Sequence, residues 1–405
     1  MRTFDEARRD IARELGLIAH PSSLPREIIS LSGSLGRTLA NEVRADRLYP
    51  PFDRSLRDGF AVRASDATPG ARLRLVGELK AGDTPTISVA PGTCIQIMTG
   101  APVPQGADAV VMIEHTRAEG EMIAFDQAVG PGQHIVKRGA EAANSHIFVN
   151  RGTRIGFAEI AAAAQVGAVE LQVYRKPRVA ILSTGDEIVP AEITPGDFQI
   201  RNSNAYSLGA QVSLAGGEPV VLANAKDAES DLREKISLGL REDMLVLSGG
   251  VSAGKYDLVE KVLGDLGAVF HFDAVAIRPG KPTVFVTCQN KPVFGLPGNP
   301  ISTMVTFELF ASLALQMLAG QEPQPLPFLE ARLGEALQEK AGLAHFLPSR
   351  LTWPGGSPNV APIKWQGSGD LAAASQSNCL LYIPADRSRF ECGEPVFVLP
   401  RRDVL

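Results

Sequence analysis

The chain has 405 residues, a formal net charge of −5 and a hydrophobic content of 44%, which is typical of a globular protein with two to four domains. Its 40 lysines and arginines form no strongly basic block. Nucleic acid is therefore not expected as a partner, because binding to phosphates requires clustered cations. The four cysteines include no C-x-x-C pair and the six histidines have no paired spacing, which argues against a zinc site and a disulfide framework. The charged N-terminus lacks the apolar core of a signal peptide, and we expect a cytoplasmic protein with no membrane partner.

The first 177 residues are predicted to be mostly β, with a helix near each end. Thr3 and Glu6 form a capping-box pattern before a helix that should reach about Leu15. Short alternating apolar runs, separated by proline and glycine, then predict a small β unit between about residues 31 and 155. Residues 157–165 again have the pattern of a helix.

Two short motifs in this β region are candidate sites. Residues 54–62 place Asp58 directly before a glycine, and residues 98–104 place Thr99 at the start of a rigid turn. Taken alone, each motif is more typical of a turn than of a binding site.

From residue 178 to residue 318, continuous apolar runs alternate with helical patterns. The predicted strands are 179–182, 219–222, 244–247, 274–277, 283–286 and 292–294. The predicted helices are 205–215, which Asn202, Ser203 or Asn204 can cap, and 229–240, 258–263 and 300–318. This alternation predicts an α/β sheet covered on both faces. Residues 319–327 have the composition of a linker, and the chain then returns to short β runs that end at 395–399.

Four loops at predicted strand ends carry the polar residues of a candidate site, namely residues 183–187, 248–257, 278–282 and 295–302. Ligands bind beyond the carboxyl ends of the strands in open α/β sheets, so we expect these loops to meet. Arg278 and Lys281 supply positive charge, while Asp186, Glu187 and Asp257 supply carboxylates suited to a hard cation. The loops together predict a site for a phosphorylated ligand held with Mg²⁺ or a similar cation.

The loop at residues 248–257 is the most informative of the four. Its glycines lie between an apolar strand and a helix, where backbone N–H groups and the helix dipole favour an anion. Asp257 at the helix start instead suits a cation or a proton. No G-x-S-x-G or Walker A motif occurs in the chain, which argues against a serine hydrolase or a P-loop NTPase.

An ordered set of motifs resembles the MoeA family of molybdopterin molybdenumtransferases, which is related to the gephyrin E domain and its plant counterpart. The motifs are Asp58-Gly-Phe-Ala-Val62, Met98-Thr-Gly-Ala-Pro-Val-Pro104, Ser183-Thr-Gly-Asp-Glu187, Ser248-Gly-Gly-Val-Ser-Ala-Gly254, Pro279-Gly-Lys-Pro282 and Leu296-Pro-Gly-Asn-Pro300. No single motif is decisive, but the ordered set is highly specific and extends over nearly the whole chain.

The resemblance implies a multidomain fold that combines α/β and β units in an elongated homodimer. Residues 1–45 with 140–177 would form an elongated N-terminal linker domain, with a mostly β domain, 46–139, inserted into it. Residues 178–322 would form a three-layer, MogA-like α/β domain that binds molybdopterin, and residues 328–405 a C-terminal β-barrel. The implied active cleft lies between the α/β domain of one subunit and the inserted β domain of the other.

The resemblance also implies the last step of molybdenum cofactor assembly. Adenylylated molybdopterin and molybdate would be the substrates, AMP would leave, and Mg²⁺ or another divalent cation would support the reaction. The upstream molybdopterin adenylyltransferase is an expected partner. The implied catalytic residues are Asp58, Thr99, Glu187, Asp227, Asp257 and Lys281, with Glu187 and Asp257 also as metal ligands. The implied substrate-binding residues are Ser183, Thr184, Gly185, Ser248, Gly249, Gly250, Ser252, Arg278, Pro279, Gly280, Pro297, Gly298, Asn299, Pro300 and Ser302.

Two alternatives stay open. A molybdopterin adenylyltransferase has a related α/β domain, but the motifs in the additional β regions disfavour it. A catalytically inactive molybdopterin-binding scaffold or paralogue is disfavoured by the presence of the acidic residues and Thr99. Lys255 departs from the family pattern, because an acidic residue is common at that position.

Overall fold

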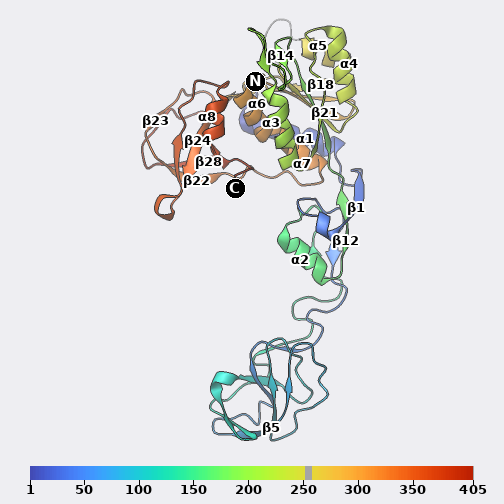
Figure 1. Ribbon diagram of the computed structural model, residues 1–405, viewed down its shortest axis with the longest axis vertical. Coiled ribbons are helices and arrows are strands. Elements are labelled where there is room, and N and C mark those ends of the chain that lie inside the picture. The colour runs from blue at the N-terminus through green and yellow to red at the C-terminus, as the bar shows by residue number, and fades with distance from the viewer. Residues whose placement is uncertain (251–257, 405) are drawn as a thin grey trace.

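The structure is a computed structural model that describes residues 1–250 and 258–404. The molecule is elongated (Figure 1), with an α/β unit and the C-terminal β unit at one end and a separate β unit at the other. A narrow neck that contains helix α2, Phe157–Gln165, joins the two ends.

A six-stranded mixed sheet forms the centre of the α/β unit, in the strand order β16-β13-β17-β21-β20-β18. Strands β16, β13, β17 and β21 run parallel, whereas β20 and β18 are antiparallel to their neighbours. The strands are β13 (Arg178–Ser183), β16 (Glu218–Val221), β17 (Met244–Ser248), β18 (Val269–Phe272), β20 (Val284–Cys288) and β21 (Lys291–Leu296).

Helices cover both faces of this sheet, as the apolar runs predict. Successive residues of a strand point to opposite faces, so Val179 and Ile181 join one buried cluster while Ala180 and Leu182 join the other. The first face is covered by α1 (Phe4–Ile18), α3 (Ser203–Leu214), α6 (Pro300–Thr306) and α7 (Ser312–Leu318), and the second by α4 (Glu229–Gly239) and α5 (Leu258–Asp265). The three-layer α/β prediction is confirmed.

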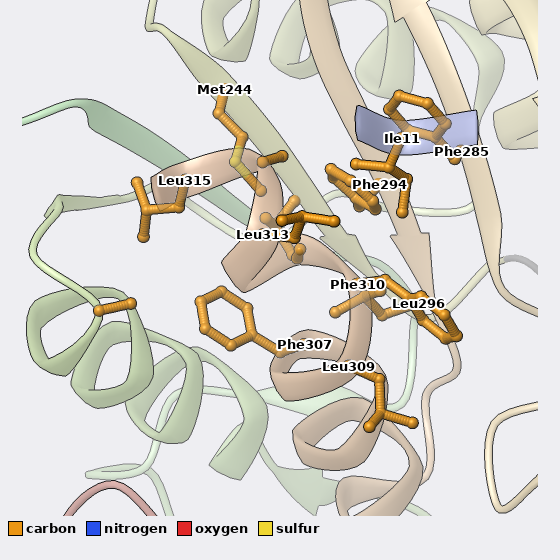
Figure 2. Packing of buried hydrophobic residues seen from close by; sticks show 14 of the residues in the cluster. Ile11, Met244, Phe285, Phe294, Leu296, Phe307, Leu309, Phe310, Leu313 and Leu315 are labelled. Carbon is orange, nitrogen blue, oxygen red and sulfur yellow. The ribbon is translucent and has the colours of Figure 1, made fainter. Parts of the chain in front are cut away.

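The longest apolar helical stretch, Pro300–Leu318, is a core element. It is long and apolar enough to cross a membrane by length and composition alone, but 78% of it is buried inside the protein. Figure 2 shows Phe307, Phe310 and Leu313 from this stretch in one cluster with Phe294 and Leu296 of β21. The prediction of one uninterrupted helix misses a π turn at Phe307–Ala311, which lies between α6 and α7.

The C-terminal region forms a closed barrel, as predicted. Strands β24, β25, β22, β28 and β26 are hydrogen-bonded in that order, and β26 pairs back onto β24. The region contains β22 (Leu329–Leu333), β23 (Leu337–Gln338), β24 (Ala344–Thr352), β25 (Asn359–Pro362), α8 (Leu371–Gln376), β26 (Cys379–Ile383), β27 (Arg389–Phe390) and β28 (Pro395–Pro400).

The predicted strand at 274–277 is wrong as an element of the α/β sheet. Residues 269–272 form the outer strand β18 instead, and β19, Ile277–Arg278, pairs in parallel with β24 of the barrel. Register places Arg278 opposite His345. The segment after residue 272 therefore leaves the α/β sheet and extends the barrel sheet.

The N-terminal region combines the neck with the distant β unit. The helix α1 begins with the predicted capping box, since the Thr3 hydroxyl accepts from the Glu6 N–H and the Glu6 carboxylate accepts from the Thr3 N–H. The neck contains β1 (Arg26–Ser30), β2 (Val43–Arg44), β11 (Ile147–Val149), α2 and β12 (Glu170–Tyr174). The distant unit contains β3 (Arg54–Ser55), β4 (Gly59–Val62), β5 (Arg72–Leu79), β6 (Thr93–Ile97), β7 (Ala109–Met112), β8 (Thr116–Glu119), β9 (Met122–Phe125) and β10 (Ile135–Val136).

Candidate functional site

A cavity of about 450 Å³ lies at the carboxyl ends of β13, β17 and β21, and we call it the cleft. These three parallel strands are neighbours in the sheet, so the loops that follow them meet at one edge. The predicted site residues that line the cleft are Ser183, Thr184, Gly185, Glu187, Asp227, Ser248, Gly249, Gly250, Pro297, Gly298, Asn299 and Pro300.

Glycines are required where two of these loops pass each other. Gly249 and Gly250 have φ values of 92° and 66°, a left-handed region that side chains rarely adopt. A Cβ atom on Gly250 would lie 2.7 Å from Thr184 Oγ1 and 2.9 Å from Val259 Cγ2, and one on Gly249 would lie 2.9 Å from the Thr184 carbonyl oxygen. The Gly249 N–H donates to the Leu296 carbonyl at 3.1 Å. Backbone, and not side chains, therefore forms this wall.

Two asparagines before and inside α3 hold the loops together. The Asn204 amide donates to Ser248 Oγ at 2.9 Å and to the Gly298 carbonyl at 2.8 Å. Asn202 caps α3 by accepting from the Ala205 N–H at 3.0 Å, and it also accepts from Ser183 Oγ at 3.2 Å. Among the residues described, Asn204 Oδ1 and Thr184 Oγ1 are buried without a hydrogen-bond partner. Buried polar atoms in native proteins are nearly always paired, so both atoms are candidates to contact a ligand.

Sequence reasoning named Asn202 and Asn204 only as alternative helix caps. Both line the cleft, together with Ile188, Ile200, Arg201 and Ser203, which the sequence-based site also lacks. The sequence did contain a signal for a second role. One capping residue is enough for the start of a helix, but two asparagines occur at this one. The second asparagine is therefore free for another role.

The carboxylates of Glu187 and Asp227 line the cleft, and Asp186 lines the cavity beside it. The Asp227 N–H donates to Asp186 Oδ1 at 3.3 Å, and the Asp227 pKa is raised by partial burial and by the negative charges of Asp186 and Glu187. The described part of the chain contains no preformed group of three metal-ligating side chains. Mg²⁺ uses only one or two protein carboxylates together with water and substrate phosphates, and a cation would relieve the crowding of negative charge. The residues present therefore fit such a cation.

Several predicted residues lie outside the cleft lining. Arg278, Pro279, Gly280 and Lys281 precede β20, which runs antiparallel and so begins at the edge where β21 ends. Only Pro282 of this loop lines the cleft. Arg278 and Lys281 are exposed, and neither forms an ion pair with the rest of the described chain. Ser302 is buried within α6, 4% exposed, while Ser252 and Asp257 belong to the segment 251–257, outside the described residues.

Asp58 and Thr99, which are 41 residues apart in sequence, meet in the distant β unit. Asp58 Oδ1 accepts from the Thr99 N–H at 2.6 Å and from Thr99 Oγ1 at 2.8 Å. These hydrogen bonds stabilise the ionised carboxylate and lower the Asp58 pKa. Figure 1 shows that this β unit lies at the opposite end of the molecule from the α/β unit. Within one chain the structure does not bring Asp58 and Thr99 to the cleft.

A larger cavity of about 620 Å³ adjoins the cleft on the side of β16 and α3. It shares Gly185, Ile188 and Asn202 with the cleft. Its other lining residues include small and apolar ones such as Ala205, Gly209 and Leu222. The cleft and this cavity together provide a polar compartment beside a more apolar one.

The glycine-rich loops at the carboxyl ends of the parallel strands are those of an α/β domain with a ligand site at this edge of its sheet. The sequence matches three family profiles: the MoeA N-terminal region (domain I and II) over residues 2–167, the probable molybdopterin binding domain over residues 180–317 and the MoeA C-terminal region (domain IV) over residues 330–400. The chain belongs to the MoeA family of molybdopterin molybdenumtransferases.

Individual relatives agree with this assignment. A molybdopterin molybdenumtransferase from Nostoc sp. is 35% identical and one from Bacillus subtilis is 32% identical; the alignments cover 92% and 93% of this chain and 88% and 90% of those proteins. The crystal structure of a molybdopterin biosynthesis MoeA protein from Pyrococcus horikoshii is 27% identical, with a TM-score of 0.81 over 99% of this chain and 100% of that one. The similarity thus extends over all regions of the molecule.

Proposed function

We propose that this protein inserts molybdenum from molybdate into adenylylated molybdopterin and releases AMP, which completes the molybdenum cofactor. The observation that supports this most directly is the cleft, where glycine backbone, short hydroxyls and carboxylates converge in the part of the chain that matches a molybdopterin binding domain. An anionic ligand with ring systems suits the polar cleft and the apolar cavity beside it.

The overall reaction balances with water as the co-reactant. Water adds across the phosphoanhydride, which gives AMP and the phosphate monoester of molybdopterin. Molybdate exchanges one oxo group for the two dithiolene sulfurs, and that oxygen leaves as water with the two thiol protons. The protein therefore needs donors for the phosphates and the oxoanion and a group that positions the attacking water.

We assign the phosphate and pterin contacts to the cleft loops. The donors near this ligand would be Ser183, Thr184, Gly185, Ser248, Gly249, Gly250, Gly298 and Asn299, and Pro297 and Pro300 would fix the last loop. Ser252, Ser302, Arg278 and Lys281 would hold the oxoanion together with the Gly280 N–H, which Pro279 positions. Arg278 and Lys281 are exposed and without ion pairs among the described residues, so both are available to an incoming anion.

The carboxylates would serve the cation and the water. Glu187 and Asp257 are the proposed ligands of Mg²⁺ or another divalent cation, which when bound neutralises charge that develops on the phosphoanhydride. Asp227 would orient the attacking water, because its raised pKa moves it toward the range of a general base.

We further propose that the active unit is an elongated homodimer in which Asp58 and Thr99 of one subunit complete the cleft of the other. The large separation of the two ends of the chain supports this arrangement. So do the exposed apolar side chains of the neck, Ile28, Leu35, Phe157 and Val169, which are 67–88% exposed, because exposed apolar groups are typical of interfaces. The proposed domains are 1–45 with 140–177, 46–139, 178–322 and 328–405.

The decisive experiment is AMP release by the purified protein, supplied with adenylylated molybdopterin, molybdate and Mg²⁺. We expect AMP release that depends on molybdate and that yields active cofactor. Binding of the nucleotide without AMP release would indicate the inactive scaffold, and formation of adenylylated molybdopterin from ATP would indicate the adenylyltransferase.

We also propose that the protein is cytoplasmic and that it contacts the upstream adenylyltransferase. Such a contact would bring the adenylylated substrate to the cleft before the substrate is hydrolysed.

A further inference from the structure

A third cavity, of about 250 Å³, lies far from the cleft and carries unusual charge. It lies where α1, the stretch Pro300–Leu318, the segment 321–327 and the C-terminal segment meet. The residues that matter are Arg8, Glu308, Ser312, Gln316 and Arg402. Glu308 is eight residues along the helix from Pro300 at the cleft, which corresponds to roughly 12 Å of helix rise. The two sites are therefore distinct.

Arg8 brings a positive charge into this cavity without a carboxylate partner. Its guanidinium donates to two carbonyl oxygens, of Leu309 at 2.6 Å and of Gln324 at 2.9 Å, and it forms no ion pair within residues 1–250 and 258–404. Burial lowers the Arg8 pKa to about 10; the negative charge of Asp5 opposes this shift, and the positive charge of Arg402 adds to it. The two carbonyls satisfy hydrogen bonds but carry no compensating charge, and Asp5 lies outside the lining of the cavity.

Arg402 is the second cation of the cavity. Its Nε donates to Glu308 Oε2 at 2.6 Å, and one of its terminal nitrogens donates to Ser312 Oγ at 3.1 Å. The Gln316 amide oxygen, when turned toward it, accepts from both terminal nitrogens at 3.1 and 3.2 Å. The cavity lining thus contains two guanidinium groups and one carboxylate, and that carboxylate is paired with Arg402.

The π turn at Phe307–Ala311 builds this arrangement into the core helix. Such turns break the regular i to i−4 hydrogen-bond pattern and are frequent at functional sites. Here the Leu309 carbonyl is available to Arg8, and Glu308 and Ser312 both face Arg402. The apolar residues of the same turn, Phe307 and Phe310, pack into the sheet cluster (Figure 2), so the polar residues are held in place.

We propose that this cavity is a binding site for a small tetrahedral oxoanion, held between Arg8 and Arg402. The charged side chains that line the cavity are two guanidinium groups and one carboxylate, which leave net positive charge there, and guanidinium forks match oxoanions well. A volume of about 250 Å³ is below the ~300–1,000 Å³ of typical small-molecule pockets, so the site suits an inorganic oxoanion better than a nucleotide. A bound anion would join the N-terminal helix to the C-terminal segment.

Sulfate is a suitable probe, because its charge does not change near neutral pH. Isothermal titration of the full-length protein with sodium sulfate, at constant ionic strength, should show saturable binding. We expect Arg8→Gln to weaken this binding about tenfold or more, as loss of a charge-assisted hydrogen-bond pair predicts. Glu308→Gln should instead tighten it, because Arg402 loses its competing carboxylate. If Arg8, Glu308 and Arg402 served only to pack the core, Glu308→Gln would not tighten sulfate binding.

The matched control is Arg9→Gln. Arg9 is the exposed neighbour of Arg8 on α1, and among the described residues its side chain donates to the Asp5 carbonyl at 3.3 Å. Sulfate affinity equal to wild type in this variant, with weaker binding in Arg8→Gln, supports the site and separates it from sulfate bound in the cleft. Equal affinities in wild type, Arg8→Gln and Glu308→Gln would overturn the proposal. If Arg8→Gln does not fold, Glu308→Gln carries the test, and unchanged or weaker binding in that variant refutes the site.

Discussion

The cleft and the Asp58–Thr99 pair lie at opposite ends of one chain, and they are built in different ways. The cleft collects loops from three parallel strands, and asparagines and glycines fix those loops against each other. The pair consists of two side chains that hydrogen-bond each other in the distant β unit. The cleft is assembled from the loops of three parallel strands, whereas the pair joins the start of β4 to the end of β6, two antiparallel neighbours.

This difference separates the part of the proposed active site that one subunit supplies from the part that a second subunit must supply. The cleft has its backbone donors, hydroxyls and two of its proposed carboxylates within one chain. The Asp58 carboxylate is kept ionised by Thr99 but faces nothing in the same cleft. If both belong to one active site, the second subunit supplies the pair.

Mixing two inactive variants tests that division most strongly. We expect Asp58→Ala and Glu187→Ala each to abolish AMP release when purified alone. In a mixture that has exchanged subunits at random, half of the dimers are mixed, and each mixed dimer has one intact cleft. The expected activity is thus about one quarter of wild type.

The control for this experiment is a mixture of Glu187→Ala with Asp227→Ala. Both substitutions affect the α/β unit, so a mixed dimer contains no intact cleft and should stay inactive. Restored activity in the control would mean that subunits combine in another way. No activity in the first mixture, despite proven subunit exchange, would place Asp58 outside the shared cleft.

A substitution in the backbone wall formed by Gly249 and Gly250 should lower AMP release nearly as much. Gly250→Val puts a branched side chain at a φ of 66° and within 2.7 Å of Thr184 Oγ1, so the loop must move. Displacement of about 1 Å costs roughly 10²-fold in rate, and AMP release should fall by that factor or more. In α5, Gly264→Ala is the control: a Cβ atom at this position would meet no neighbouring group within 4 Å, and alanine should leave the rate unchanged while adding about 0.5–1 kcal/mol of helix stability.

We expect Asp227→Asn to stabilise the fold and to lower activity. Partial burial and the negative charges of Asp186 and Glu187 raise the Asp227 pKa in the folded protein, so above that folded pKa the ionised carboxylate destabilises the fold. Asparagine removes this penalty, and we expect Tm to rise by about 1–2 °C at pH 7. The gain should vanish below pH ~4, where aspartate is protonated in both the folded and unfolded states.

The same substitution should lower AMP release by at least about tenfold if Asp227 orients the water. Mg²⁺ should also raise the Tm of wild type more than that of the variant, because the cation relieves the same repulsion. A lower Tm at pH 7 would contradict the electrostatic account, and an unchanged rate would remove Asp227 from the reaction.

The sequence was sufficient to predict the α/β sheet and most of the cleft, for a physical reason. Apolar runs and helical patterns alternate between residues 178 and 318, and parallel strands must place their following loops at one edge. Two of the loops are therefore predictable neighbours even though Thr184 and Gly250 are 66 residues apart.

The features that the sequence did not predict depend on contacts between residues far apart in the chain, which no local sequence pattern indicates. Strand β19 has two residues, too few to show a period, and its partner β24 belongs to the barrel. Asn204 lies near a helix start, where a cap is the simplest interpretation, and only the fold shows that it reaches Ser248 and Gly298. The charged cavity at Arg8 depends on residues from both ends of the chain, which sequence spacing does not connect.

The smallest predicted effect concerns a single hydroxyl. Thr184 Oγ1 is buried and has no hydrogen-bond partner among the described residues, so valine, which has the same shape, removes no favourable contact there. We expect Thr184→Val to leave Tm unchanged or slightly higher while weakening the binding of inorganic pyrophosphate about 3–10-fold, as loss of one hydrogen bond predicts. Thr303→Val is the contrast, because Thr303 Oγ1 donates to the Pro297 carbonyl at 2.5 Å and to the Asn299 carbonyl at 3.1 Å. It should lower Tm by removing the donor to the Pro297 carbonyl, whereas the Asn299 carbonyl still accepts from the Thr303 N–H at 3.0 Å. If the two variants lose equal stability, the Thr184 hydroxyl has a structural partner and is not held ready for a ligand.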